Sequence, residues 1–310
     1  MELPSESTAP LDGTTSGWVR SVPPRLAVFS IAVAALLACF HRPLLDLARF
    51  SFGHDLYSYI LLIPPVSLYL MWLVRKERRM GGAPAARLAL LPLALGLGLL
   101  VVYWAGRRAG RQFEPTDYLA VMTLSLWSFI AASCCIFLGA RTLRAIAFPL
   151  VFLLFASPLP ASAYRAFESF LQHASATTAY GFFWAAFTPV WQDGLLLHLP
   201  GIGVEVAPEC SGIRSTLVLF ITSALAAHLF LRGPWRRAVL ICAVLPLALL
   251  RNGFRIFIIG ELCVHVGPQM INSPIHRHGG PLFFGLSLIP FLWLLRRLRR
   301  SEVSASPSLQ

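Results

Sequence analysis

Three short polar segments in an otherwise apolar chain contain residue types that can together carry out acyl transfer. Glu209-Cys210-Ser211-Gly212 supplies a thiol, Asn252-Gly253-Phe254-Arg255 supplies a guanidinium, and Ile275-His276-Arg277-His278 supplies an imidazole. In acyl transfer a thiolate attacks a carbonyl carbon, an imidazole moves the proton, and a guanidinium stabilises the negative oxygen. These three segments are therefore the candidate reactive groups, and the elements that carry them must bring them together.

Cys210 differs from the other five cysteines because its neighbours are polar. The others lie within or beside apolar stretches, where cysteine behaves as a small hydrophobe: Cys39, Cys134, Cys135, Cys242 and Cys263. We expect Cys210 at or just before the first turn of a helix, where unpaired N–H groups and the helix dipole favour a thiolate. Arg214 is expected one turn later on the same helix face. Taken alone, this context leaves a buried structural cysteine as an equal alternative.

Arg251 and Arg255 interrupt an apolar run and, being four residues apart, share one face of a helix. Arginine at membrane depth costs about 2.5 to 3.5 kcal/mol on insertion scales, so the pair needs partners or a wet cavity. For Arg251 the alternative is that its side chain reaches outward to the lipid headgroups. His276 and His278 precede the last apolar run, where a histidine is most often only a solvated residue.

The composition defines the elements that must position these groups. Of 310 residues, 56% are hydrophobic and 13% charged, and the mean hydropathy is +0.67, which excludes a water-soluble enzyme. The net charge of +12 comes almost entirely from arginine, since Lys76 is the only lysine. The arginines form short tracts between apolar runs, which indicates membrane topology and not nucleic-acid binding.

The apolar runs predict an all-α polytopic membrane protein with about eight transmembrane helices. The expected spans are 25–41, 57–74, 87–105, 118–138, 145–157, 212–231, 237–258 and 281–295. Residues 164–187 mix polar and aromatic side chains and predict an amphipathic helix on the membrane surface. Two short β-prone runs flank Pro200-Gly201 and predict a small extracytoplasmic hairpin before Cys210.

Four arginine tracts follow spans two, four, six and eight, and therefore belong to one membrane face. The positive-inside rule assigns that face to the cytoplasm, so both termini are expected inside and residues 188–209 outside. Arg107, Arg108 and Arg111 disagree with this orientation, but four tracts outweigh one. The orientation places Cys210, Arg255 and His276 on the outer face of the cell inner membrane.

The chain is expected to divide into a flexible cytosolic tail (1–24), a transmembrane domain (25–295) and a basic cytosolic tail (296–310). Ser, Thr, Pro and Gly are abundant in the first segment, which lacks the layout of a cleaved signal peptide.

The chain resembles the exosortases, of the exosortase/archaeosortase family of membrane cysteine transpeptidases. The resemblance rests on residues 209–215, on the Asn252-x-x-Arg255 motif, and on His276 followed by Gly280 and Phe283-Phe284. An upstream segment containing Tyr57-Ser58-Tyr59 and Ile63-Pro64 adds to it. The similarity covers about residues 50 to 295.

The resemblance implies Cys210 as nucleophile and Arg255 and His276 as the other catalytic residues, with Arg251 and His278 as nearby rivals. It implies substrates that are secreted proteins with a C-terminal sorting signal: a short motif such as Pro-Glu-Pro, a transmembrane helix and a basic tail. Cleavage outside the cytoplasm would pass the acyl group to a surface acceptor.

Substrate binding is assigned to four residues: Glu209, Arg214, Arg251 and Asn252. Arg214 and Arg251 are each a turn from a catalytic residue and suit an acidic group of the sorting motif. Membrane lipid is the other expected partner, and no nucleic acid, cofactor or metal is expected.

Two alternatives remain open at this stage. One is a transporter or lipid carrier in which Arg251 and Arg255 form an anion site, although neither paired half-helices nor an inverted repeat is visible. The other is an intramembrane protease that transfers the acyl group to water. A metalloprotease is disfavoured because no HExxH occurs and the histidines lack a carboxylate cluster.

Overall fold

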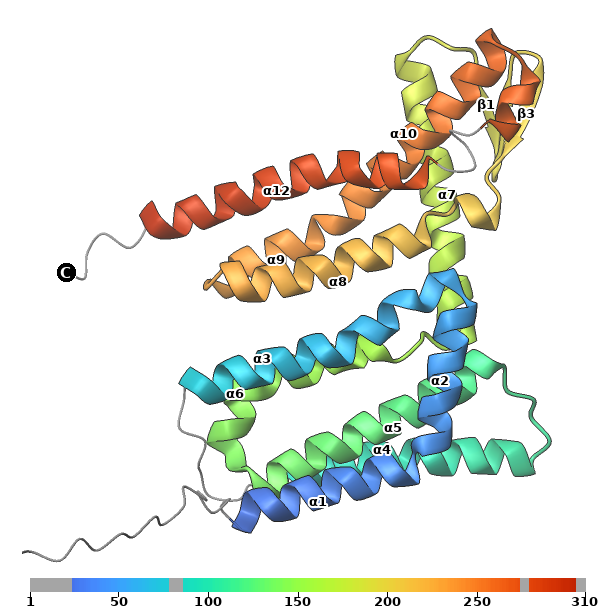
Figure 1. Cartoon of the computed structure of the whole chain (residues 1–310). Helices are drawn as coiled ribbons and strands as arrows, with labels where there is room; N and C mark the ends of the chain where they lie inside the picture. The colour runs from blue at the N-terminus through green and yellow to red at the C-terminus, as the bar shows by residue number, and fades with distance from the viewer. Residues whose placement is uncertain (1–23, 78–85, 274–278, 305–310) are drawn as a thin grey trace, which may run out of the picture.

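The computed structural model describes residues 24–77, 86–273 and 279–304, and it is helical apart from one small sheet (Figure 1). Within these residues seven helices are long and apolar enough to cross a membrane. A further pair, Arg25–Cys39 and His41–Gly53, is bent by 65° and makes an eighth span if it crosses as one unit. The prediction of an all-α polytopic membrane protein with about eight spans is confirmed.

The helices follow most of the expected spans closely, but the seventh span continues to His265, beyond its expected end at residue 258, and the last continues to Ser304, beyond residue 295. The α-helices are α1 Pro24–Cys39, α2 His41–Gly53, α3 Ile63–Glu77, α4 Ala86–Arg108, α5 Pro115–Phe137, α6 Gly139–Phe152, α7 Ala161–Ala185, α8 Ile213–Phe230, α9 Pro234–Cys242, α10 Val244–His265 and α12 Gly280–Ser304. The 3-10 helices are η1 Asp55–Leu62, η2 Leu153–Ala156, η3 Pro208–Cys210 and η4 Pro268–Asn272.

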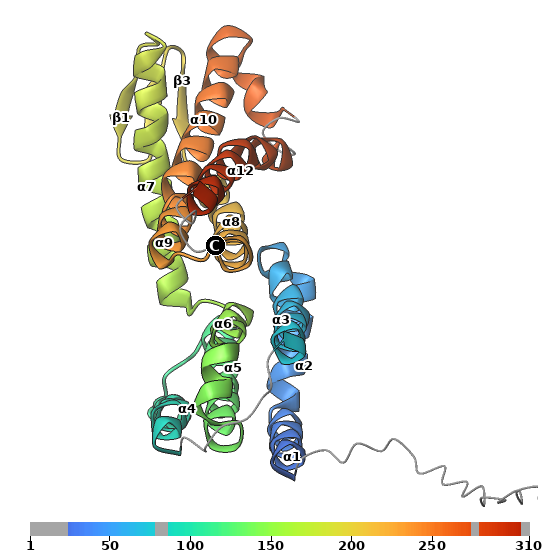
Figure 2. The ribbon, with the colours of Figure 1, turned by 90° about the vertical axis from the view of Figure 1, so that its left-hand side faces the viewer.

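The helices form two groups that lie side by side, a first group of α1 and α3 to α6 and a second group of α8, α9, α10 and α12 (Figures 1 and 2). α7 runs across one end of both groups and is not among the candidate spans. Its amphipathic sequence and crosswise direction agree with the expected surface helix. Near its start, α7 is tied to α5: Ala161 N donates to Asp117 Oδ1 (2.8 Å), and Arg165 pairs with Glu114 (2.6 Å).

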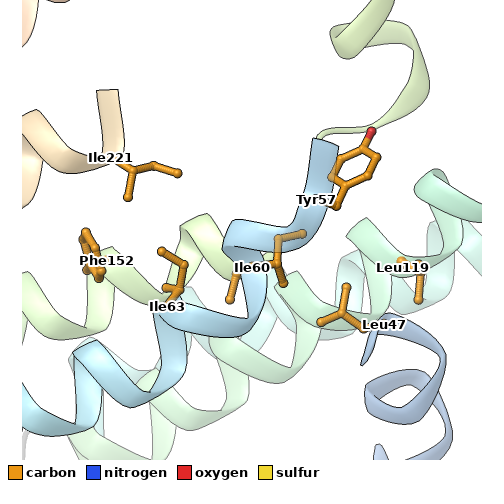
Figure 3. Packing of buried hydrophobic residues seen from close by; sticks show 8 residues of the cluster. Leu47, Tyr57, Ile60, Ile63, Leu119, Phe152 and Ile221 are labelled. Carbon is orange, nitrogen blue, oxygen red and sulfur yellow. The ribbon is translucent and has the colours of Figure 1, made fainter. Parts of the chain in front are cut away.

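A cluster of buried apolar side chains joins the two groups (Figure 3). Ile60 and Ile63 of the first group lie in this cluster with Phe152 of α6, and Ile221 of α8 is its member from the second group. Inside a bilayer, contacts of this kind stabilise through close packing, because lipid tails are as apolar as the side chains themselves.

α7 and α10 pack more closely than ordinary side chains would allow, because small residues face each other. A Cβ atom added to Gly253 would lie 2.6 Å from Thr178 Cγ2 and 3.1 Å from the backbone nitrogen of Ala179. A Cβ at Gly260 would overlap the ring of Phe183. Glycine at these positions therefore allows the helix that carries Arg251 and Arg255 to lie directly against α7.

The expected hairpin around Pro200-Gly201 is present, but it belongs to a three-stranded antiparallel sheet. The strands are β1 Trp191–Asp193, β2 Leu196–Leu199 and β3 Ile202–Glu205, in the order β1-β2-β3. The additional strand, β1, was not predicted. The chain turns from β1 into β2 at Gly194, which has φ +57°. Leu197 and Val204 pack with Phe183 of α7 and Ile256 of α10. The sheet is thus fixed to both helices just before η3.

The described residues of the arginine tracts lie at one end of the two groups, where α3, α5, α8 and α12 finish (Figure 1). The sheet and α7 lie at the opposite end. Arg107 and Arg108, which disagree with the positive-inside rule, also lie there, at the end of α4. The structure therefore separates an arginine-rich face from a face that holds the sheet and Cys210.

Cysteines introduced on the two faces are expected to react differently in intact cells. Asp193→Cys, on the exposed edge of the sheet, should be labelled by a membrane-impermeant maleimide, whereas Arg141→Cys, in the arginine-rich face, should be labelled only after lysis. Labelling of the parent chain gives the baseline, since six native cysteines are present. The reverse pattern would invert the orientation.

Candidate active site

Cys210 ends the short 3-10 helix η3, directly before α8. Its N–H donates to the carbonyl oxygen of Ala207 (2.8 Å), and the N–H of Ser211 donates to that of Pro208 (3.0 Å). α8 begins at Ile213, after Gly212 has turned the chain at φ +72°. The prediction that Cys210 lies just before the first turn of this helix is confirmed. The prediction that Cys210 and Arg214 share a helix face is wrong, because the left-handed backbone of Gly212 separates Cys210 from α8.

Gly212 is required by its surroundings as well as by its backbone. A positive φ is strained for residues with a side chain. A Cβ there would also lie 3.0 Å from Asn252 Cγ and 3.2 Å from Arg251 Nη2. The turn after Cys210 therefore rests directly on the polar residues of α10.

Asn252 fixes the backbone at Cys210. Its side chain is 3% exposed, and Nδ2 donates to the carbonyl oxygen of Cys210 (2.7 Å) and to Ser175 Oγ (3.0 Å). These two bonds join η3, α10 and α7. Ser175 is fully buried and was not identified from the sequence. The only sequence feature that indicates its role is a hydroxyl on the packed face of an amphipathic helix.

Arg255 lies one turn after Arg251 on α10 and interacts electrostatically with the Cys210 thiol. Its guanidinium is half-buried, so its charge is screened by water less than that of an exposed arginine. The structure thus brings together the predicted nucleophile and the predicted arginine, although 45 positions separate them in the sequence.

A cavity of about 700 Å³, here called the site cavity, lies beside this pair. Its walls come from η1, α7, η3, α8, α10 and the start of α12. Five predicted site residues line it: Glu209, Arg214, Arg251, Asn252 and Arg255. Cys210 lies between the lining residues Glu209 and Ser211. The polar segments around Cys210 and Arg255 therefore border one space large enough for several residues of a peptide.

Arg251 is buried at the wall of the site cavity, with an exposed fraction of 8%. Neither of its terminal nitrogens has a hydrogen-bond partner among the described residues. The alternative in which Arg251 reaches out to the headgroups is therefore wrong. A buried guanidinium is costly without a partner, so this position favours an anionic group of a bound molecule.

Arg214 points across the mouth of the site cavity to Asp55 of η1, with 3.5 Å between Nη1 and Oδ2. The side chains are 54% and 92% exposed, so the pair contributes at most about 1 kcal/mol. Asp55 was not identified from the sequence, because its role depends on the contact between the two helix groups. Such a weak pair can exchange its partner for a charged ligand at little cost.

Tyr164 and Glu168 form the α7 wall of the site cavity. The Tyr164 hydroxyl donates to Glu168 Oε1 (2.9 Å). Burial and this hydrogen bond hold the pKa of Tyr164 above its usual value, so the phenol remains a neutral donor at neutral pH. Neither residue was assigned to the site from the sequence.

His276 and its rival His278 lie outside the described residues. Beyond them, Gly280, Phe283 and Phe284 line the site cavity, and these are the residues whose offsets from His276 favoured it. In the described part of the chain no group of three or more His, Cys, Asp or Glu residues is arranged to hold a metal ion.

The fold and the site together define a polytopic membrane protein with a cysteine and an arginine at one end of its helices, beside a cavity lined by both charged and apolar side chains. The chain belongs to the transmembrane exosortase (EpsH) family, whose model matches residues 48–293. This match confirms the resemblance found from the sequence motifs. Neither the curated proteins nor the solved structures contain a match to the chain.

Replacing Asn252 with aspartate should loosen the turn that holds Cys210. The carboxylate keeps the shape of the side chain but removes the donor to the Cys210 carbonyl, a loss of about 1 to 3 kcal/mol for a buried hydrogen bond. We expect a lower melting temperature and faster alkylation of Cys210, measured by peptide mass spectrometry. The control Gln192→Glu makes the same change at an exposed hydrogen bond. Unchanged alkylation and melting in Asn252→Asp would contradict the role of Asn252.

Proposed function

We propose that this exosortase is a cysteine endopeptidase and transpeptidase that cleaves C-terminal sorting signals of secreted proteins. The observation that carries the proposal is that Arg255 and the two neighbours of Cys210 line one cavity, while the bond from Asn252 to the Cys210 carbonyl holds the turn that carries the thiol. A structural cysteine would need neither the neighbouring cation nor the cavity. The proposed location is the inner membrane, with the site facing outward.

The proposed reaction has two steps. The Cys210 thiolate attacks the scissile carbonyl carbon, Arg255 stabilises the resulting oxyanion, and His276 passes the thiol proton to the leaving amine. The peptide C–N bond breaks, a thioester remains on Cys210, and the tail helix leaves. An acceptor amine, hydroxyl or water then attacks the thioester carbon, and His276 takes its proton. The C–S bond breaks and the Cys210 thiolate is released.

Substrate recognition is proposed for Arg251 and Arg214. The unpaired terminal nitrogens of Arg251 suit the carboxylate of an acidic residue in the sorting motif, which would remove the cost of its burial. Arg214 can exchange Asp55 for a second anionic group. Glu209, exposed at the cavity wall, suits a cationic group or a backbone N–H of the substrate.

Asn252 fits a different role from the substrate binding expected of it. The two bonds from Nδ2 use both of its N–H donors on protein partners. We therefore propose Asn252 as a positioning residue that holds the Cys210 turn against α10.

A transporter with an anion site is the second candidate, because Arg251 is buried and unpaired within the described part of the chain. Transport needs no thiol, however, and gives no reason for the link between Asn252 and Cys210. Removal of the thiol therefore distinguishes the two functions.

Cys210→Ala is expected to abolish processing of a co-expressed substrate while the protein still inserts in the membrane. An unactivated hydroxyl is a far weaker nucleophile, so Cys210→Ser should also be inactive. Mass spectrometry of the substrate C-terminus reports cleavage, the site and any attached group. The control Cys242→Ala, at an exposed cysteine, should retain normal processing. Normal processing by Cys210→Ala would refute the mechanism.

Arg255 and Arg251 should give different kinetic signatures. Arg255→Lys should lower kcat by about 10²- to 10³-fold, because an ammonium lacks the planar fork that holds the developing oxyanion. Arg251→Gln should mainly raise KM and be partly rescued by more substrate. His276→Ala should resemble Arg255→Lys, and His278→Ala should be mild. If Arg251→Gln instead lowers kcat and leaves KM unchanged, the two arginine roles are exchanged.

A further inference from the structure

A second cavity lies at the arginine-rich face, at the far end of α8 from Cys210. It has a volume of about 720 Å³ and lies where α8 ends, α9 begins and α12 finishes. We call it the arginine cavity. Its lining residues are His228, Leu229, Phe230, Leu231, Arg232, Gly233, Arg236, Arg237, Arg299 and Glu302.

The arginine cavity carries a large positive charge. Four arginines and one glutamate line it, which gives a net charge of +3 over these described residues with histidine neutral. Glu302 is mainly committed to the backbone, since it accepts from the N–H groups of Arg232 (3.0 Å) and Gly233 (2.7 Å). Glu302 also forms an ion pair with Arg236, with 3.7 Å between Oε1 and Nη1, and so offsets one of the four arginine charges.

Three of the arginines are held in place before any ligand arrives. Arg236 Nε donates to Ser301 Oγ (3.1 Å), and Arg237 Nε donates to the carbonyl oxygen of Leu231 (2.7 Å). Arg299 lies over the ring of Phe230, with Cζ 5.8 Å from the ring centroid. Preorganised guanidiniums lose less conformational entropy when they bind an anion.

Two tryptophans indicate the depth of the arginine cavity in the membrane. Trp235 of α9 and Trp293 of α12 are 77% and 58% exposed, and Arg297 lies 5.3 Å from the Trp293 ring centroid. Exposed tryptophans collect at the level of the lipid headgroups. The arginines therefore lie near the depth at which lipid phosphates are found.

We propose that the arginine cavity binds the phosphate of an anionic phospholipid from the leaflet on the arginine-rich face. The forked donors of arginine match phosphate oxygens, and a net negative headgroup offsets the charge of the cavity. The volume exceeds that needed by a phosphate ion and accommodates a headgroup. The positive-inside rule explains why arginines lie on this face, but it does not require four of them to converge on one cavity. The site is separate from the proposed reaction.

The test uses the full chain, purified in detergent, stripped of lipid and titrated by native mass spectrometry. Phosphatidylglycerol should bind about tenfold more tightly than phosphatidylcholine, which has a phosphate but no net charge. Arg232→Gln combined with Arg299→Gln should remove this preference. The control Arg141→Gln with Arg144→Gln takes the same charge from the same face, outside the cavity lining, and should change binding less than twofold.

Four results would overturn the proposal. Equal losses in the two double variants would mean that general surface charge attracts the lipid. No preference for phosphatidylglycerol in the wild-type chain would exclude an anionic lipid. Displacement of the lipid by millimolar inorganic phosphate, with the same dependence on Arg232 and Arg299, would make soluble phosphate the ligand. If the double variant melts early, Arg299→Gln alone should still weaken lipid binding about threefold, and unchanged binding would refute the site.

Discussion

The bond from Asn252 to the Cys210 carbonyl determines the geometry of the site, because it fixes a non-helical turn against a helix from another part of the chain. A turn at the membrane surface has few backbone bonds of its own, and the two i to i+3 bonds of η3 do not orient it. Asn252 supplies that orientation, and Ser175 in turn holds Asn252. Gly212 allows the approach because it has no side chain to obstruct Asn252. The position of the thiol relative to Arg255 follows from these contacts.

The same region contains a charged group whose burial is costly. Arg251 is buried without a protein partner in the described residues, beside a second guanidinium of like charge. Gly253, two residues further along α10, allows α7 to pack closely against the same part of this helix. The buried cation and the close helix contact therefore lie within one turn of α10.

Hydropathy and the arginine tracts were sufficient to predict the spans and the separation of the two faces, and the mixture of polar and aromatic residues predicted the helix α7. These features depend on the bilayer, which acts on each segment separately. The shared face of Cys210 and Arg214 was predicted wrongly, because a positive φ at Gly212 cannot be read from its type alone. β1 was missed because a three-residue strand has little periodicity. Asp55 and Ser175 were missed, and Arg251 was left ambiguous, because their roles depend on contacts between distant segments.

α7 also has a mechanical consequence. Its 25 residues make a rod of about 37 Å, anchored to α5 through Arg165 and Ala161 at one end and to the sheet near the other. A tilt of about 5° between the helix groups would displace the far end of such a rod by about 3 Å. Tyr164 and Glu168 lie within two turns of the α5 anchor, whereas other walls of the site cavity come from α8, α10 and α12 of the second group. The width of the space beside Cys210 therefore depends on the angle between the two helix groups.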